Sequence, residues 1–249
     1  NSEGIAITSN REELMAKLAA DQKTLDGWLN LQYDFSYMNY RNDYFCGSFD
    51  NAAILNPTFP IYNADGSYFV PTGTVTSNPV SDAYQKTSYK DGDFFRGSVK
   101  ATVNVKPIKG LKLNGFGALE EGDNYKYWYN SVDYYDAANA GMAGRSTDRS
   151  KNTLFEGTAD YVGQWGGHSL ATVLGGYYQN FWYDGSSMQN GGFLTDDSKY
   201  YQLQNGDATK KDMTISSYRN SNTLISFFGR ANYDYKSKYL LSATFRADG

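Results

Sequence analysis

Residues 224–249 of the 249-residue chain read LISFFGRANYDYKSKYLLSATFRADG, and they show its structural pattern most clearly. Apolar and polar residues alternate on both sides of a short polar segment at 236–238. Successive side chains of a β-strand point to opposite faces, so an alternation with period two indicates a strand with one apolar face. The stretch therefore predicts two antiparallel strands, 225–234 and 239–246, joined by a tight turn.

The same alternation recurs along most of the chain. It predicts further strands at 28–40, 98–105, 111–120, 154–161 and 168–183, although the register of the last is unclear. Residues 13–21 also alternate, but their Glu, Leu, Met and Ala favour a helix as well, so both possibilities stay open there. This gives an all-β chain of about eight strands.

The connections between these strands alternate in length. Short turns are expected at 22–27, 107–110, 164–167 and 236–238, and long polar loops at about 41–93, 130–150 and 184–222. Transmembrane β-barrels have short periplasmic turns and long extracellular loops, whereas soluble domains seldom place three long loops at one end. We predict one domain over 1–249: an antiparallel up-and-down meander that is part of a large transmembrane β-barrel.

The charged residues of the strands with a clear register fall on one side. A charge on the lipid-facing side of a barrel costs about 2–4 kcal/mol for Arg or Lys at mid-membrane. We therefore expect the charged side to face the lumen. The predicted lumen-facing residues are Asp34, Lys100, Lys112, Glu120, Glu156, Asp160, Arg230, Asp234 and Arg246.

Aromatic residues gather at both ends of the predicted strands. Trp28, Trp165, Tyr235 and Tyr239 lie near the short turns, and a second group, including Tyr40 and 181–183, lies near the long loops. Two such belts match the interfacial girdles of membrane barrels. The alternative, a soluble or surface-attached β-sandwich that binds glycan, explains the alternation but not the two belts.

The composition argues against several other classes of protein. The net charge is only −4 and no basic block is present, so a nucleic-acid footprint is missing. One cysteine, Cys46, allows neither an internal disulfide nor a Cys-based zinc site within this chain. The single His168 argues against a catalytic triad, and the adjacent Glu120 and Glu121 point to opposite sides of a strand. We expect no enzyme activity, no cofactor and no metal.

Aromatic residues in and beside the long loops are candidate substrate contacts, because their rings can stack on sugars while their polar tips form hydrogen bonds. The alternative is that they pack the loops together or form the upper girdle. The predicted contacts are Tyr68, Tyr84, Tyr127, Trp128, Tyr135 and Tyr183.

The amino-acid sequences of three stretches resemble the SusC/RagA family of TonB-dependent nutrient transporters. Residues 224–249 resemble a signature hairpin of that family and are the most specific match. Residues 52–68, AAILNPTFPIYNADGSY, resemble one of its loop segments, and 166–177, GGHSLATVLGGY, resemble one of its barrel strands. The order of the three also fits, so the resemblance covers nearly the whole chain.

The resemblance implies a place in a plugged barrel of about 22 strands in the outer membrane. It implies import of oligosaccharides or peptides in Bacteroidetes, energised by the TonB complex through a plug domain and a TonB box. We expect both of these parts to lie outside this chain, as an internal fragment. The implied partners are a SusD-like surface lipoprotein, the TonB complex, the glycan or peptide substrate and outer-membrane lipid.

Overall fold

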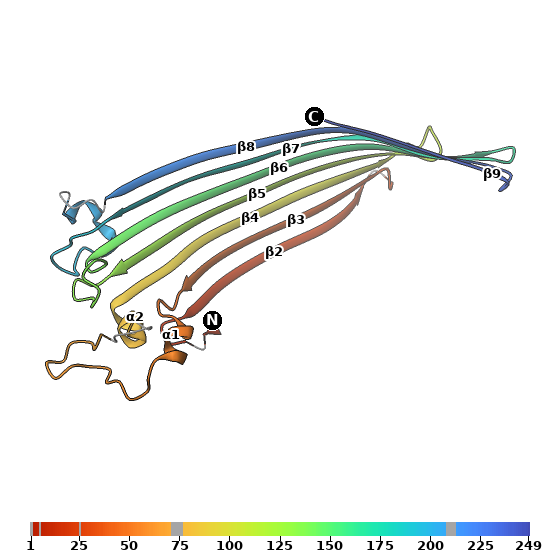
Figure 1. Ribbon diagram of the computed structural model, residues 1–249. Helices are drawn as coiled ribbons and strands as arrows, with labels where there is room; N and C mark the ends of the chain where they lie inside the picture. The colour runs from red at the N-terminus through yellow and green to blue at the C-terminus, as the bar shows by residue number, and fades with distance from the viewer. Residues whose placement is uncertain (1, 5, 25, 71–76, 208–212) are drawn as a thin grey trace.

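A computed structural model describes residues 2–4, 6–24, 26–70, 77–207 and 213–249. Its strands form one antiparallel sheet, and their order, β1 to β9, follows the order of the chain (Figure 1). The strands are β1 (Ser2–Glu3), β2 (Asn10–Thr24), β3 (Leu29–Asp43), β4 (Lys86–Asn104), β5 (Leu111–Asn130), β6 (Met142–Trp165), β7 (His168–Asn190), β8 (Thr214–Tyr235) and β9 (Tyr239–Asp248). The predicted up-and-down meander is confirmed, and β1 is a short addition to the eight strands expected.

The two ambiguous segments are both strands. β2 pairs with β3 along its whole length, from Asn10 opposite Asp43 to Thr24 opposite Leu29, so 13–21 is not helical. β7 begins opposite Tyr235 and pairs without interruption up to Gln189, which settles the register of 168–183. Cross-strand pairing thus overrides the helix propensity of the β2 sequence.

The turns at one end of the sheet are tight. Gly166 and Gly167 connect β6 to β7 with φ angles of +51° and +86°, which a two-residue hairpin of the primed type requires. Lys236 and Ser237 adopt φ angles of +53° without being glycine. The carboxylate of Asp234 accepts a hydrogen bond of 2.7 Å from the Ser237 N–H and so holds that turn.

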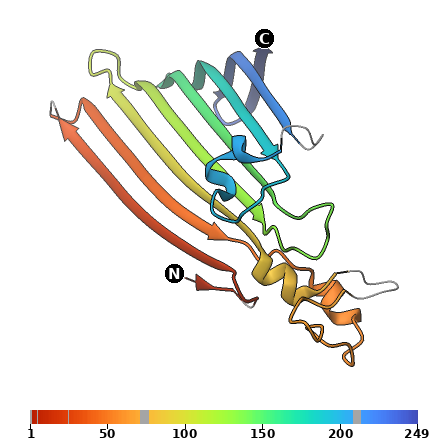
Figure 2. The ribbon, with the colours of Figure 1, turned by 90° about the vertical axis from the view of Figure 1, so that its left-hand side faces the viewer.

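The long connections all lie at the opposite end, but they are shorter than predicted (Figures 1 and 2). They span 44–85, 131–141 and 191–213, not 41–93, 130–150 and 184–222, because the strands continue into the polar sequence. The first loop contains helices α1 (Phe49–Ile54) and α2 (Pro79–Gln85), and the third contains short 3-10 turns η1 (Lys199–Tyr201) and η2 (Leu203–Asn205). Ladder hydrogen bonds need no apolar alternation, so these extensions left no pattern in the sequence.

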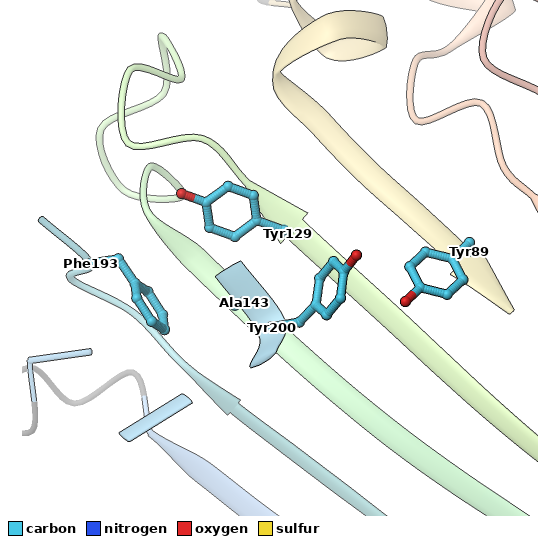
Figure 3. Packing of buried hydrophobic residues seen from close by; sticks show 5 residues of the cluster. All are labelled: Tyr89, Tyr129, Ala143, Phe193 and Tyr200. Atoms are coloured by element: carbon cyan, nitrogen blue, oxygen red, sulfur yellow. The ribbon is translucent and has the colours of Figure 1, made fainter. Parts of the chain in front are cut away.

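The buried core lies at the loop end. Residues 191–205 fold back over the ends of β4–β6, where Tyr89, Tyr129, Ala143, Phe193 and Tyr200 are buried together (Figure 3). Elsewhere large apolar side chains are exposed; Leu174, for example, is 61% exposed. The described strands form one sheet with no second sheet against it, so the β-sandwich alternative receives no support. No helix in the described ranges is long and apolar enough to cross a bilayer.

Candidate functional site

The strand register divides the sheet into two chemically distinct faces. Directly opposite residues of an antiparallel pair point to the same face, as do residues two apart on one strand. The register pairs Asp34 with Ser98, Lys112 with Asp160 and Phe228 with Arg246, and the remaining pairs connect these rows. All nine predicted lumen-facing residues therefore lie on one face, which we call the polar face. Their assignment to the lumen stays a prediction.

Side chains of the polar face form contacts between strands. Lys17 Nζ lies 3.2 Å from Asp34 Oδ2, and Arg96 Nε lies 3.1 Å from Glu120 Oε1. Asn114 Nδ2 donates hydrogen bonds to Thr158 Oγ1 at 3.0 Å and to Asp160 Oδ2 at 2.5 Å. These contacts keep a hydrogen-bonding surface ordered without the cover of a second layer.

The opposite face, which we call the apolar face, carries an uncharged band. On β5 the band runs from Leu111 to Leu119, and on β4 it runs from Phe95 to Val103. Nine residues per strand match the length that a tilted transmembrane strand needs, about 9–11 residues. The lower edge of the band is aromatic: His168 stacks on Trp165 at 5.8 Å and contacts Tyr235 at 4.7 Å between ring centroids.

Charge returns to the apolar face directly above this band. Lys151 pairs with Glu121 at 2.7 Å, Arg149 with Asp123 at 2.8 Å and Arg219 with Asp184 at 2.8 Å. Asp123, Arg149, Asp184 and Arg219 lie side by side on neighbouring strands, and their charges alternate in sign. Charges are thus excluded from the band but not from the face, as a bilayer of limited thickness requires.

A row of side chains crosses the polar face at the loop end. The register aligns Tyr40, Gly92, Asn124, Asp148, Gly185 and Tyr218. The Tyr40 hydroxyl donates to Asn124 Oδ1 at 2.5 Å, and the Tyr218 hydroxyl donates to Asp148 Oδ1 at 2.6 Å. Each tyrosine reaches across one strand, so Asn124 and Asp148 are held side by side between two aromatic rings.

Two glycines make this row possible. A Cβ atom added to Gly92 would lie 2.5 Å from Tyr40 Cζ, and one added to Gly185 would lie 2.4 Å from Tyr218 Cζ. Both rings therefore lie across the bare backbone of the neighbouring strand. The hydrogen bond to Asp148 raises the pKa of Tyr218, so this phenol stays protonated and continues to donate.

The predicted substrate contacts are not brought together. Trp128 and Tyr183 lie on the polar face, the first over Gly144 and the second 5.4 Å from Tyr218 between ring centroids. Tyr127 points to the apolar side, where it stacks on Tyr89 at 4.8 Å. Tyr127 therefore cannot contact the same ligand as Trp128 and Tyr183.

The other three predicted contacts lie in or at the loops. Tyr68 packs on Tyr62 at 5.0 Å, and Tyr135 packs on Tyr134 at 4.5 Å between ring centroids. Tyr84 is 65% exposed on α2. Loop packing thus accounts for two of the three, and contact with substrate stays a prediction for all six.

A hydrogen-bonded carboxylate holds the third loop onto the strand ends. Asp196 accepts hydrogen bonds from the Tyr129 hydroxyl, from Ser131 Oγ at 2.8 Å and from the Val132 N–H at 2.9 Å. Burial acts to raise the pKa of Asp196, but these three donors outweigh it and the pKa is lowered. The carboxylate is therefore ionised and bound at neutral pH.

A second contact of this kind ties α2 to the loop 131–141. The Tyr134 hydroxyl donates to Asp82 Oδ1 at 2.6 Å, and Lys86 Nζ lies 2.9 Å from the same carboxylate, which is buried. Burial and this hydrogen bond together raise the pKa of Tyr134. The two contacts therefore hold α2, the loop 131–141 and the segment around Asp196 on the ends of the strands.

Asn124, Asp148 and Tyr218 were not among the residues predicted for a site, and Tyr40 was predicted to be part of an aromatic girdle. Glycine inside a strand, here Gly92 and Gly185, marks a close approach of another group. The sequence offered no such signal, because both glycines lie in segments that were predicted as loops. In the described part of the chain, no group of three or more His, Cys, Asp or Glu side chains is placed to hold a metal ion.

Comparison with known proteins points in one direction. No family model matches the chain. It is 34% identical over 200 residues to TonB-dependent receptor P3 of Formosa agariphila, covering 78% of this chain and 19% of that protein. It is 24% identical over 278 residues to TonB-dependent receptor SusC of Bacteroides thetaiotaomicron, covering 99% of this chain and 26% of that protein.

A solved structure shares the fold. The RagAB peptide transporter structure matches 96% of this chain and 28% of its own with a TM-score of 0.76 at 18% identity. The chain thus spans about a fifth to a quarter of the length of the curated relatives it matches.

Proposed function

Because this chain belongs to the SusC/RagA type of TonB-dependent outer-membrane receptors, we propose that it forms lumen wall and extracellular rim in an importer of oligosaccharides or peptides. The observation that carries the proposal is the two-faced sheet. Every predicted lumen-facing charge lies on the polar face, whereas the apolar face carries an uncharged band of transmembrane length. A sheet of this kind separates lipid from a hydrated path.

The loop end is the proposed entrance for substrate. All three long connections lie there, and Trp128, Tyr183, Tyr40 and Tyr218 place aromatic rings on the polar face just below them. We propose that a SusD-like lipoprotein covers this end, and that the TonB complex acts through parts of the receptor outside this chain. The relatives are named as receptors or a transporter, so no enzymatic activity is proposed.

Thiol labelling of the complete receptor tests the assignment of the faces. In a receptor whose cysteines, Cys46 included, are all replaced by serine, single cysteines replace Ser98 and Thr102 on the polar face, and Val99 and Ala101 on the apolar face. A membrane-impermeant, water-soluble maleimide should react at 98 and 102, and a lipid-soluble maleimide should react at 99 and 101. Equal reaction of the water-soluble reagent at all four positions would refute the proposed wall.

The same experiment extends to the partner and the substrate. A cysteine at the exposed loop residue Ala64 should react in the free receptor and be protected when the surface lipoprotein is bound. Bound substrate should protect a cysteine at Ser146 but not one at Val99. Unchanged labelling at Ala64 would contradict the proposal that the lipoprotein covers this end. Unchanged labelling at Ser146 would contradict the proposal that substrate binds this part of the wall.

A further inference from the structure

A row of cations lies on the polar face two residues above the row of Tyr40 and Tyr218. The register aligns Arg11, Asn42, Lys90, Lys126, Ser146, Ser187 and Ser216, which we call the basic row. It stands out because the chain as a whole has a net charge of −4. Every member carries a hydrogen-bond donor, and three carry a positive charge.

Two of the lysines are neighbours without a counter-charge. Lys90 lies directly opposite Lys126, a position at which Cβ atoms are about 5 Å apart and like charges destabilise a sheet. Among the described residues, neither lysine forms an ion pair with a carboxylate. Lys126 is exposed and Lys90 is partly buried. Two adjacent lysines without a carboxylate partner, on a surface rich in hydrogen-bond donors, can bind an anionic group of a ligand.

The carboxylates on the same part of the face are already engaged. Glu13 Oε2 lies 2.6 Å from Arg11 Nη2, and Asp148 accepts from Tyr218. Neither carboxylate forms an ion pair with Lys90 or Lys126.

An aromatic ring lies beside the cations. The ring of Tyr40 has the Arg11 guanidinium 5.2 Å from its centroid and Lys90 Nζ at 5.9 Å. Its hydroxyl is bound to Asn124, so the ring is held in place from both ends of the residue. A ring fixed in this way offers a flat apolar surface to a sugar at little cost in entropy.

The basic row and the row of Tyr40 and Tyr218 favour different chemical groups of one ligand. The basic row favours anions, whereas the row below offers an amide and a carboxylate, Asn124 and Asp148, between aromatic rings. The rows are two residues apart, or about 7 Å along the strands. Asp148 would repel an anionic group placed beside it, but it accepts hydrogen bonds from hydroxyl groups, which a saccharide supplies and an oligoglutamate does not. A saccharide that carries both anionic substituents and free hydroxyls satisfies both rows.

We propose that the loop end of the polar face is a subsite for an anionic oligosaccharide, with Lys90 and Lys126 binding its carboxylate or sulfate groups and Tyr40 packing on a sugar ring. This inference rests on the proposed transport function and names the substrate class of the same wall. It favours a charged saccharide over a neutral one and over an acidic peptide.

Equilibrium binding to the purified complete receptor tests the subsite. The probes are oligogalacturonate, its neutral methyl ester, a sulfated galactan oligosaccharide and an oligoglutamate peptide. Wild type should bind at least one anionic saccharide more tightly than the neutral ester and the peptide. Its affinity should fall with added salt. The Lys90→Gln/Lys126→Gln variant should lose about tenfold in affinity per lysine for that probe and most of the salt dependence.

Two further variants make the result specific. Lys151→Gln removes the same charge from the apolar face and should leave all affinities unchanged. Tyr40→Ala should lower the affinity for the saccharides but not the affinity for inorganic sulfate, which is measured as a further probe. If oligoglutamate binds most tightly, the substrate is not a saccharide. If wild type and the double variant bind all probes equally, the loop end holds no anion subsite. The thiol labelling of Ser98 and Val99 would still report on the wall, so the two proposals fail separately.

Discussion

Asp196 shows how much of the rim depends on one side chain. It links Tyr129 and Ser131 at the end of β5 to the third loop through three hydrogen bonds. Replacing Asp196 with Ala would leave the Tyr129 hydroxyl, in a residue that is 3% exposed, without its acceptor. A buried polar group that loses its partner costs about 1–3 kcal/mol. We expect this cost to release 191–205 without unfolding the sheet.

Hydrogen exchange of the complete receptor measures the release. Amides of 191–205 should exchange faster in Asp196→Ala, whereas amides of β5 and β6 in the apolar band should not change. Asp197→Ala is the matched control, because Asp197 is exposed one residue away. Equal exchange in the two variants would mean that ring packing, and not the carboxylate, holds the loop.

The lowered pKa of Asp196 gives this contact a pH dependence of known sign. A carboxyl whose pKa is lower in the folded state stabilises above the ordinary value of about 3.9, and this contribution disappears as pH falls through the lowered pKa. A fluorophore is attached to Leu194→Cys in a receptor whose other cysteines, Cys46 included, are replaced by serine. It should give a constant signal from pH 7 to about 5. Release of the loop should begin only at more acidic pH. A transition near neutrality would contradict the role of Asp196.

At the scale of single elements, alternation predicts the transmembrane parts of the strands and fails beyond them. The predicted starts of β5, β7 and β9 agree with the structure, because each strand follows directly on a short turn that is visible in the sequence. The prediction for β5 stops at 120, but the strand continues to Asn130, through polar and aromatic residues that no longer alternate. Pairing with β4 and β6 sustains this part, and pairing partners are not visible in the local sequence.

The same limit applies to the candidate site. The common face of the nine charged residues could be predicted, because each lies in an alternating stretch. The row of Tyr40, Asn124, Asp148 and Tyr218 could not, because it depends on the register of strand ends that were taken for loops. Tyr127 and Trp128 are neighbours on opposite faces, so a one-residue error in register exchanges their roles.

The apolar band makes a sharp prediction about adjacent residues on β4. Val99 lies on the apolar face and Ser98 lies on the polar face, directly opposite Asp34. Val99→Arg should destabilise the complete receptor in lipid vesicles by about 2–4 kcal/mol, because the charge enters the bilayer. Ser98→Arg places the same charge beside a carboxylate and should change the free energy of unfolding little. Urea unfolding measures both, and equal losses would mean that the band does not face lipid.

At the scale of the whole molecule, the sheet is open, and this determines how the chain behaves by itself. In the described part of the chain, β9 pairs only with β8, and β2 meets β1 only at Asn10 and Arg11. Most backbone groups along the outer sides of β2 and β9 are therefore unpaired. In hydrocarbon each unpaired group costs several kcal/mol, so a stable barrel closes and leaves no edge.

We therefore expect the 249-residue chain to associate through its edges when it is expressed alone and refolded into detergent. Size-exclusion chromatography should show mixed oligomers, while the complete receptor should elute as one species. Supplying the rest of the barrel as a second polypeptide should convert the oligomers into one complex, because it pairs with β2 and β9 together. A monodisperse, protease-resistant 249-residue chain would contradict this expectation. It would mean that β2 and β9 satisfy their edges within the chain, and the wall would then have to be a self-contained sheet and not a sector of a larger barrel.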